Sequence, residues 1–153
     1  MSLPRLRLCA AVALLVVGIA PGMMVSAAEW IDAPLSPETW WEQHGEWKTQ
    51  SYDIPLAAGD ALEHMLNLEE GAMIVYHWTV DMDDASLLTA EFHGHTEIEG
   101  TEPGTVMFYS KHTNGAERGS LRAPFTGVHG WYLNNESEQD IVVKLEVAGY
   151  FSD

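Results

Sequence analysis

The stretch AMIVYHWTV, residues 72–80, decides the fold class. It is dense in β-branched and aromatic residues, whose side chains suit the pleated, half-buried surface of a strand. Turn-forming residues enclose it, with EEG at 69–71 before it and DMDD at 81–84 after it. A short apolar run with such limits predicts a β-strand rather than a helix.

Segments of the same kind recur on both sides, separated by turn residues. Pro55 in the first of them lacks a backbone N–H, which favours the edge of a sheet. The predicted strands cover residues 52–56, 61–68, 72–80, 86–96, 105–112, 118–123, 128–133 and 141–147. This spacing predicts an all-β domain, a sandwich or jelly roll of about eight antiparallel strands.

One short helix is expected before the strands. Ser36 is a suitable N-cap, Pro37 suits the first helical position and Glu38 suits the first turn. Gly45 would end the helix, which is predicted over residues 37–44. Residues 28–49 are therefore interpreted as an N-terminal arm with a short helix, and residues 50–153 as the sandwich domain.

The first residues have the three parts of a secretory signal peptide. Arg5 and Arg7 precede an apolar run over residues 8–20, and Val25 and Ala27 occupy the small-residue positions. We expect cleavage after Ala27, which makes residues 1–27 the signal peptide. The mature chain of 126 residues is then expected in the periplasm or outside the cell.

Charge and cysteine content exclude several classes of function. The mature chain keeps five basic and 23 acidic side chains, a formal charge of −18, which repels nucleic acids. The single cysteine, Cys9, leaves with the signal, so disulfides and thiolate metal sites are excluded. The mature chain has no apolar run of about 18 residues and is expected to lack a transmembrane span. Another envelope protein is a reasonable partner.

Metal-ligating side chains are densest in EFHGHTE, residues 91–97. In a strand, alternate residues share a face, which groups the two histidines with the two glutamates. Two imidazoles and a carboxylate can bind one copper, zinc or iron ion. Histidines in two later predicted strands could join them. The candidate ligands are Glu91, His93, His95, Glu97, His112 and His129. The alternative is a solvated polar face without a metal.

The segments FHG (92–94) and APFTGVHGWYLN (123–134) resemble the globular part of bacterial envelope proteins described as transmembrane anchor proteins. The segments VYHW (75–78) and VAGYF (147–151) are also similar to that family. The resemblance covers residues 50–151 and implies a β-sandwich like the Golgi-dynamics (GOLD) domain. It implies an envelope location but no reaction. Members of that family usually keep an N-terminal membrane helix, whereas this N-terminus looks cleavable.

The chain also resembles cupins. The spacing His93-x-His95-x-x-x-Glu99 is similar to the first cupin motif, and His129 is similar to the later histidine that completes a cupin metal site. The resemblance implies a metal held by Glu99, His93, His95 and His129. The sequence departs from the cupin pattern at Leu87, where a glycine is expected.

Three functions remain open from the sequence. We expect a non-enzymatic periplasmic accessory protein that holds a transition metal at His93 and His95, helped by His129 and Glu91 or Glu97. The second is a cupin-like metalloenzyme with an open coordination position and a pocket that excludes water. The third is a protein-interaction module of the envelope that binds no small ligand.

Overall fold

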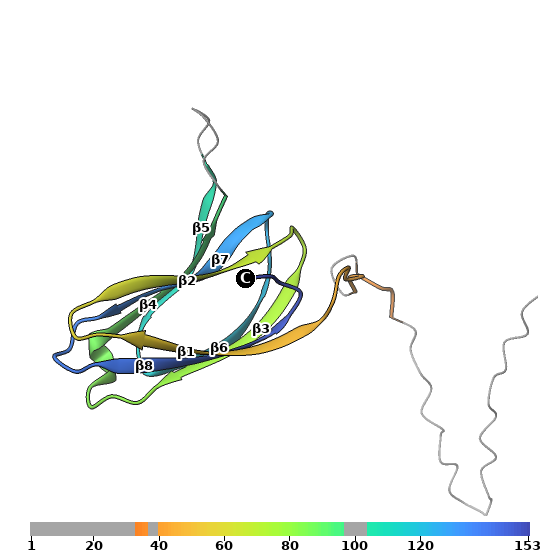
Figure 1. The fold of residues 1–153 in the computed structure, drawn as a ribbon. Helices are drawn as coiled ribbons and strands as arrows, with labels where there is room; N and C mark the ends of the chain where they lie inside the picture. The colour runs from red at the N-terminus through yellow and green to blue at the C-terminus, as the bar shows by residue number, and fades with distance from the viewer. Residues whose placement is uncertain (1–32, 37–39, 97–103) are drawn as a thin grey trace, which may run out of the picture. The chain divides into compact units, whose positions relative to one another are not determined.

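The computed structural model describes residues 33–36, 40–96 and 104–153, and residues 40–153 belong to one compact unit. This unit is all-β, with two four-stranded antiparallel sheets that face one another (Figure 1). The strands are β1 (Lys48–Leu56), β2 (Ala61–Leu68), β3 (Met73–Val80), β4 (Leu88–His95), β5 (Val106–Thr113), β6 (Ala116–Arg122), β7 (Gly127–Asn135) and β8 (Ile141–Gly149). The predicted fold class is confirmed.

The strand order is that of a jelly roll. One sheet runs β1-β8-β3-β6 and the other runs β2-β7-β4-β5. The pairs β1·β8, β2·β7, β3·β6 and β4·β5 are those of one long hairpin with its turn between β4 and β5. Rolling this hairpin brings β3 against β8 and β4 against β7, which joins the pairs into two packed sheets.

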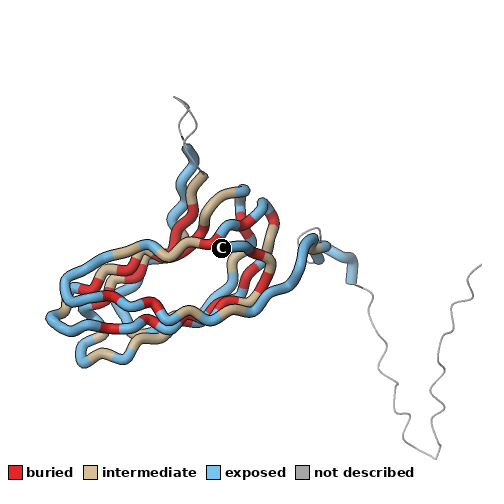
Figure 2. The backbone as a smooth tube through the Cα atoms, in the orientation of Figure 1, coloured by how far each residue is buried: buried red, intermediate tan, exposed pale blue. Residues whose placement is uncertain are grey.

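Each predicted strand overlaps an observed one, and β2 has the predicted bounds. Pro55 lies in β1, at the edge of its sheet, as its missing N–H requires. The buried and exposed residues alternate along most strands (Figure 2). The inward residues form one core around Trp78 and Trp131, in which Phe92 stacks on Trp131 with ring centroids 4.6 Å apart.

The N-terminal helix is not helical where the structure describes it. Residues 37–39 lie outside the described residues, and residues 40–44 are irregular. Gln43 donates to the carbonyl of Gly71 and accepts from the amide of Met73, both at 3.1 Å. Trp41 covers the guanidinium of Arg122 at 3.4 Å. These contacts hold the segment against the start of β3 and the last residue of β6. A helix here would point the side chains of Trp41 and Gln43 in other directions and lose these contacts. Among the described residues, the helical structure is one 3₁₀ turn, Ala85–Leu87.

Gly94 in β4 lies opposite His129 in β7, and both face the core. A Cβ atom on Gly94 would overlap Nδ1 of His129 and lie 2.6 Å from the hydroxyl of Tyr109. We predict that Gly94→Ala lowers the free energy of unfolding by about 1–3 kcal/mol, because the packed imidazole has no room to move. Urea unfolding would measure the change.

The same substitution in a His129→Ala background is the control. The overlapping imidazole is then absent, so Gly94→Ala should cost clearly less than in the parent protein. An equal cost in both backgrounds would show that the close approach to His129 is not the cause.

Candidate metal centre

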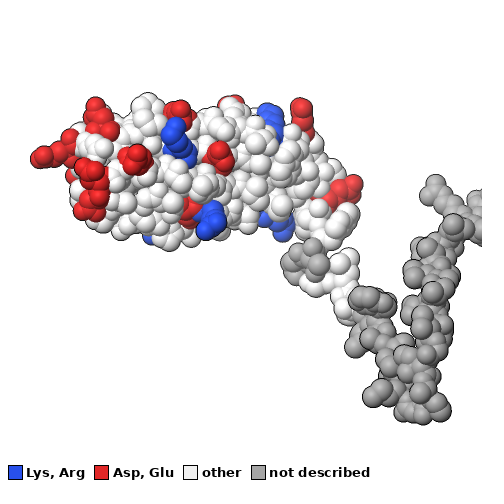
Figure 3. All heavy atoms as spheres, turned by 90° about the horizontal axis from the view of Figure 1, so that it is seen from below, with Lys and Arg blue, Asp and Glu red and all other residues white. Residues whose placement is uncertain are grey.

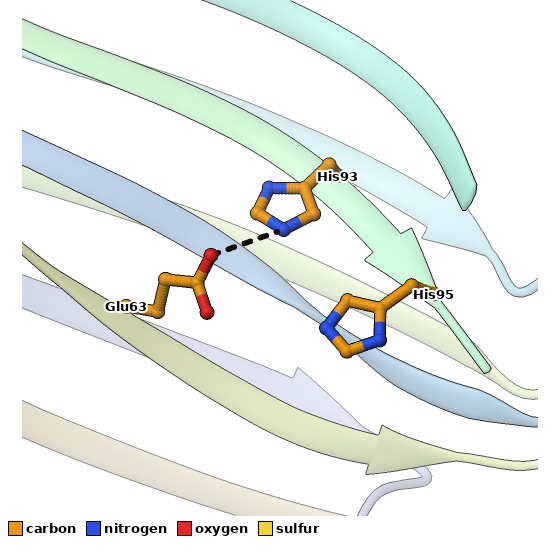
Figure 4. A group of neighbouring side chains, drawn as sticks. All are labelled: Glu63, His93 and His95. Carbon is orange, nitrogen blue, oxygen red and sulfur yellow. Dashed lines mark ion pairs between the residues drawn. The ribbon is translucent and has the colours of Figure 1, made fainter. Parts of the chain in front are cut away.

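Three ligand-type side chains converge on one sheet: Glu63 from β2, and His93 and His95 from β4 (Figure 4). One ligand atom from each lies within 4.8 Å of the other two. Nε2 of His93 lies 3.6 Å from Oε1 of Glu63. The three residues therefore lie close enough together to hold a metal ion.

The two histidines are on the outer face of their sheet. Leu88, Ala90 and Phe92 are buried, so these alternate residues of β4 face the core. His93 and His95 consequently face away from it, as the sequence predicted for two residues in one strand. His93 is nevertheless only 5% exposed, because neighbouring side chains cover it.

Gly130 explains how Glu63 reaches across the sheet. Strand β7 lies between β2 and β4, and Gly130 is paired with both Met65 and His93. It carries no side chain, so β7 places nothing over the outer face beside His93. A Cβ there would overlap the carbonyl oxygen of His64 and lie 2.8 Å from Cα of Met65. Strand β2 thus approaches β7 closely at this position, on the side where Glu63 extends toward His93.

Backbone carbonyls orient both imidazoles. Nδ1 of His93 lies 3.4 Å from the carbonyl oxygen of Glu91, and Nδ1 of His95 lies 3.1 Å from that of Thr96. A carbonyl only accepts, so these contacts favour the tautomer with the proton on Nδ1 and the lone pair on Nε2. At His93 this lone pair faces a carboxylate oxygen. Two electron-pair donors in that arrangement suit a shared cation.

The spacing is compatible with a first-row metal. Bonds of about 2.0–2.1 Å in tetrahedral geometry separate neighbouring ligand atoms by roughly 3.3 Å. The 3.6 Å between His93 and Glu63 is close to this value. The side chain of Glu63 is half exposed, so it can rotate to shorten the wider distances. Two imidazoles and one carboxylate suit zinc, copper or iron better than calcium or magnesium.

The three residues line an open pocket of about 860 Å³ on this face. Glu91 and Thr96 contribute polar atoms to the pocket, and Val106, Phe108 and Tyr132 contribute apolar surface. Three protein ligands leave at least one coordination position of a metal unfilled. That position would be open to the pocket.

Among the described residues, the other candidate ligands do not join this group. Glu91 shares the outer face but forms an ion pair with Lys111 at 3.1 Å. His112 pairs with Ala90, on the core-facing side of the sheet edge, and lies 3.7 Å from Glu117. The glutamates at positions 97 and 99 lie outside the described residues.

His129 is on the opposite face, which corrects the expectation that it helps His93 and His95. It is fully buried and pairs with Gly94 in the core. Its Nε2–H donates to the carbonyl of Phe125 at 3.0 Å, and its Nδ1 accepts from the hydroxyl of Tyr109 at 2.8 Å. Burial raises the pKa of Tyr109 to about 12, which keeps this donor protonated. Both nitrogens of His129 are thus occupied by hydrogen bonds inside the sandwich.

Glu63 was missed by the sequence analysis. Alternation along β2 shows that it faces outward, but nothing local shows which strand lies beside β2. Its proximity to His93 depends on β7 joining β2 to β4, a pairing between segments about 65 residues apart.

Neither a protein-family model nor a curated protein matches this sequence. The resemblances to the GOLD-like envelope proteins and to cupins therefore stay predictions. Within the described residues, no helix has the length and hydropathy needed to cross a membrane.

Burial shifts the pKa of two core-facing histidines, His129 and His64. It lowers the pKa of His129, assisted by the charges of His95 and His93 and opposed by the hydrogen bond to Phe125. It also lowers the pKa of His64, opposed by the charge of Asp153. Each side chain therefore binds fewer protons in the folded protein than in the unfolded chain, where the histidine pKa is about 6.5.

We therefore predict that these histidines lower the free energy of unfolding as pH falls from about 7 to 5, by at most about 1.4 kcal/mol per pH unit each. His129→Gln should show a shallower fall than the parent protein, with the contribution of His64 retained. Urea unfolding at each pH would measure both slopes. Equal slopes would contradict the role given to His129.

Proposed function

We propose that this chain is an exported accessory protein of the cell envelope that binds one divalent transition-metal ion through Glu63, His93 and His95. The convergence of these side chains in the lining of an open pocket carries the proposal. The signal-like N-terminus supports export.

The donor set supports copper or zinc as the ion. Imidazole nitrogen and carboxylate oxygen bind both metals, and Cu²⁺ forms the tightest complexes in the divalent series. No thiolate is present after residue 9 to select a softer ion. The half-exposed Glu63 gives the metal a route to solvent, which suits an ion that is taken up and passed on.

The charge of the protein also favours cations. The whole chain has a formal charge of −16, and acidic side chains gather toward one end of the face in Figure 3. A field of this sign raises the local concentration of cations and speeds their encounter with the protein. Salt screens this attraction. The acidic surface therefore assists binding, while the three ligands determine where the ion binds.

The geometry supports binding more than catalysis of the cupin type. A cupin-like enzyme needs its histidines inside the sandwich, around a cavity that excludes water. Here His93 and His95 face outward, while His129 is hydrogen-bonded within the core. The described residues therefore do not bring the three imidazoles of the cupin-like set to one point.

Isothermal titration with Zn²⁺ and Cu²⁺ tests the proposal. We predict one high-affinity ion per chain. His93→Ala and His95→Ala should each weaken binding by at least about 100-fold. Loss of a hydrogen bond that only supports a ligand already weakens metal binding by up to about 100-fold, and loss of the ligand itself should weaken it at least as much. Glu63→Gln should weaken it less, because the amide oxygen remains a poor ligand.

Matched controls separate this site from loose binding to an acidic surface. His77→Ala removes an exposed histidine from the other sheet, and Glu146→Gln removes the exposed carboxylate paired with it. Both should leave the affinity unchanged. Equal binding by the parent protein and the His93→Ala/His95→Ala double variant would refute the proposed site and leave a partner-binding sandwich as the better hypothesis.

A further inference from the structure

The pocket beside the candidate metal centre has an apolar wall made by β5. Val106 pairs with His95 and Phe108 pairs with His93, so each histidine has an apolar neighbour on the adjacent strand. Val106 is 54% exposed and Phe108 is 64% exposed, and both line the pocket. The rings of Phe108 and His93 lie with their centroids 5.8 Å apart.

A β-bulge puts Phe108 there. The register between β4 and β5 shifts after Phe92, which pairs with Ser110, so that His93 pairs with Phe108. Tyr109 is the extra residue, and it turns inward to contact Phe92 and His129. Without the shift, Tyr109 would pair with His93 on the outer face and Phe108 would pair with Gly94 on the inner face. Bulges commonly redirect a side chain beside a functional site, and this one places an aromatic ring next to a candidate ligand.

The polar side of the pocket does not oppose an anion strongly. Glu91 lines it, but Lys111 pairs with that carboxylate at 3.1 Å. A divalent ion bound with Glu63 would leave the centre with one net positive charge. The open coordination position would then attract an anionic oxygen donor.

We infer that the pocket binds a small organic carboxylate with an apolar, preferably aromatic, body. This inference rests on the proposed metal site. The carboxylate fills the open position on the metal, and the apolar body lies on Phe108 and Val106. A volume of about 860 Å³ is within the range of pockets that hold small organic molecules. The ligand and the metal together complete the site, which suits a protein that carries a chelated ion.

Binding of phenylacetate and acetate to the Co²⁺-loaded protein tests the inference. Both acids offer the same donor group, and only phenylacetate offers an apolar body. The visible absorption of Co²⁺ reports a new ligand on the metal. We expect phenylacetate to bind about tenfold more tightly than acetate, because its ring buries apolar surface.

Variants of the wall separate the two contributions. With Co²⁺ at saturation in every variant, Phe108→Ala should bring the two affinities to within about twofold, whereas Phe108→Leu should keep most of the preference. Val142→Ala removes an exposed apolar side chain from the other sheet and should change nothing. Phe108 is itself exposed, so its replacement leaves the core intact.

Each other outcome has one meaning. Failure to bind Co²⁺ would overturn the metal site and this inference with it. Tight binding of Co²⁺ with equal affinities for the two acids, or with no change in the spectrum, would overturn the inference alone. Equal binding of phenylacetate to metal-free protein would show that the pocket does not anchor its ligand through the metal.

Discussion

The alternation of side chains along β4 is the constraint on which both the core and the candidate metal centre depend. Phe92 stacks on Trp131 inside the sandwich, and His93 and His95, on either side of Gly94, therefore lie on the outer face of the sheet. A slip of one residue would put His93 and His95 in the core and expose Phe92. The packing of one aromatic ring thus fixes which face carries the chemistry.

Two glycines adapt the sheet to this arrangement, one on each face. Gly94 leaves room in the core for His129, whose nitrogens are both hydrogen-bonded. Gly130 lets β2 approach on the outer face, where Glu63 reaches His93. The bulge in β5 adds Phe108 to the outer face. Two glycines and one β-bulge therefore shape the pocket, and the strands around it keep regular pairing.

The sequence predicted what depends on neighbours along the chain. Alternation in residues 91–97 correctly placed His93 and His95 on one face, and turn residues located all eight strands. It could not assign His129, because its face depends on the register of β7 against β4. Glu63 was missed for the same reason. The helix expected over residues 37–44 failed in its described part because Gln43 bonds to the backbone of Gly71 and Met73, contacts that local propensity does not contain.

Anomalous diffraction from crystals soaked in Zn²⁺, recorded on both sides of the zinc absorption edge, tests the central claim most directly. The account predicts one strong peak about 2.0–2.2 Å from Nε2 of His93, an imidazole nitrogen of His95 and a carboxylate oxygen of Glu63. No peak at this position, with zinc scattered over surface carboxylates, would contradict it.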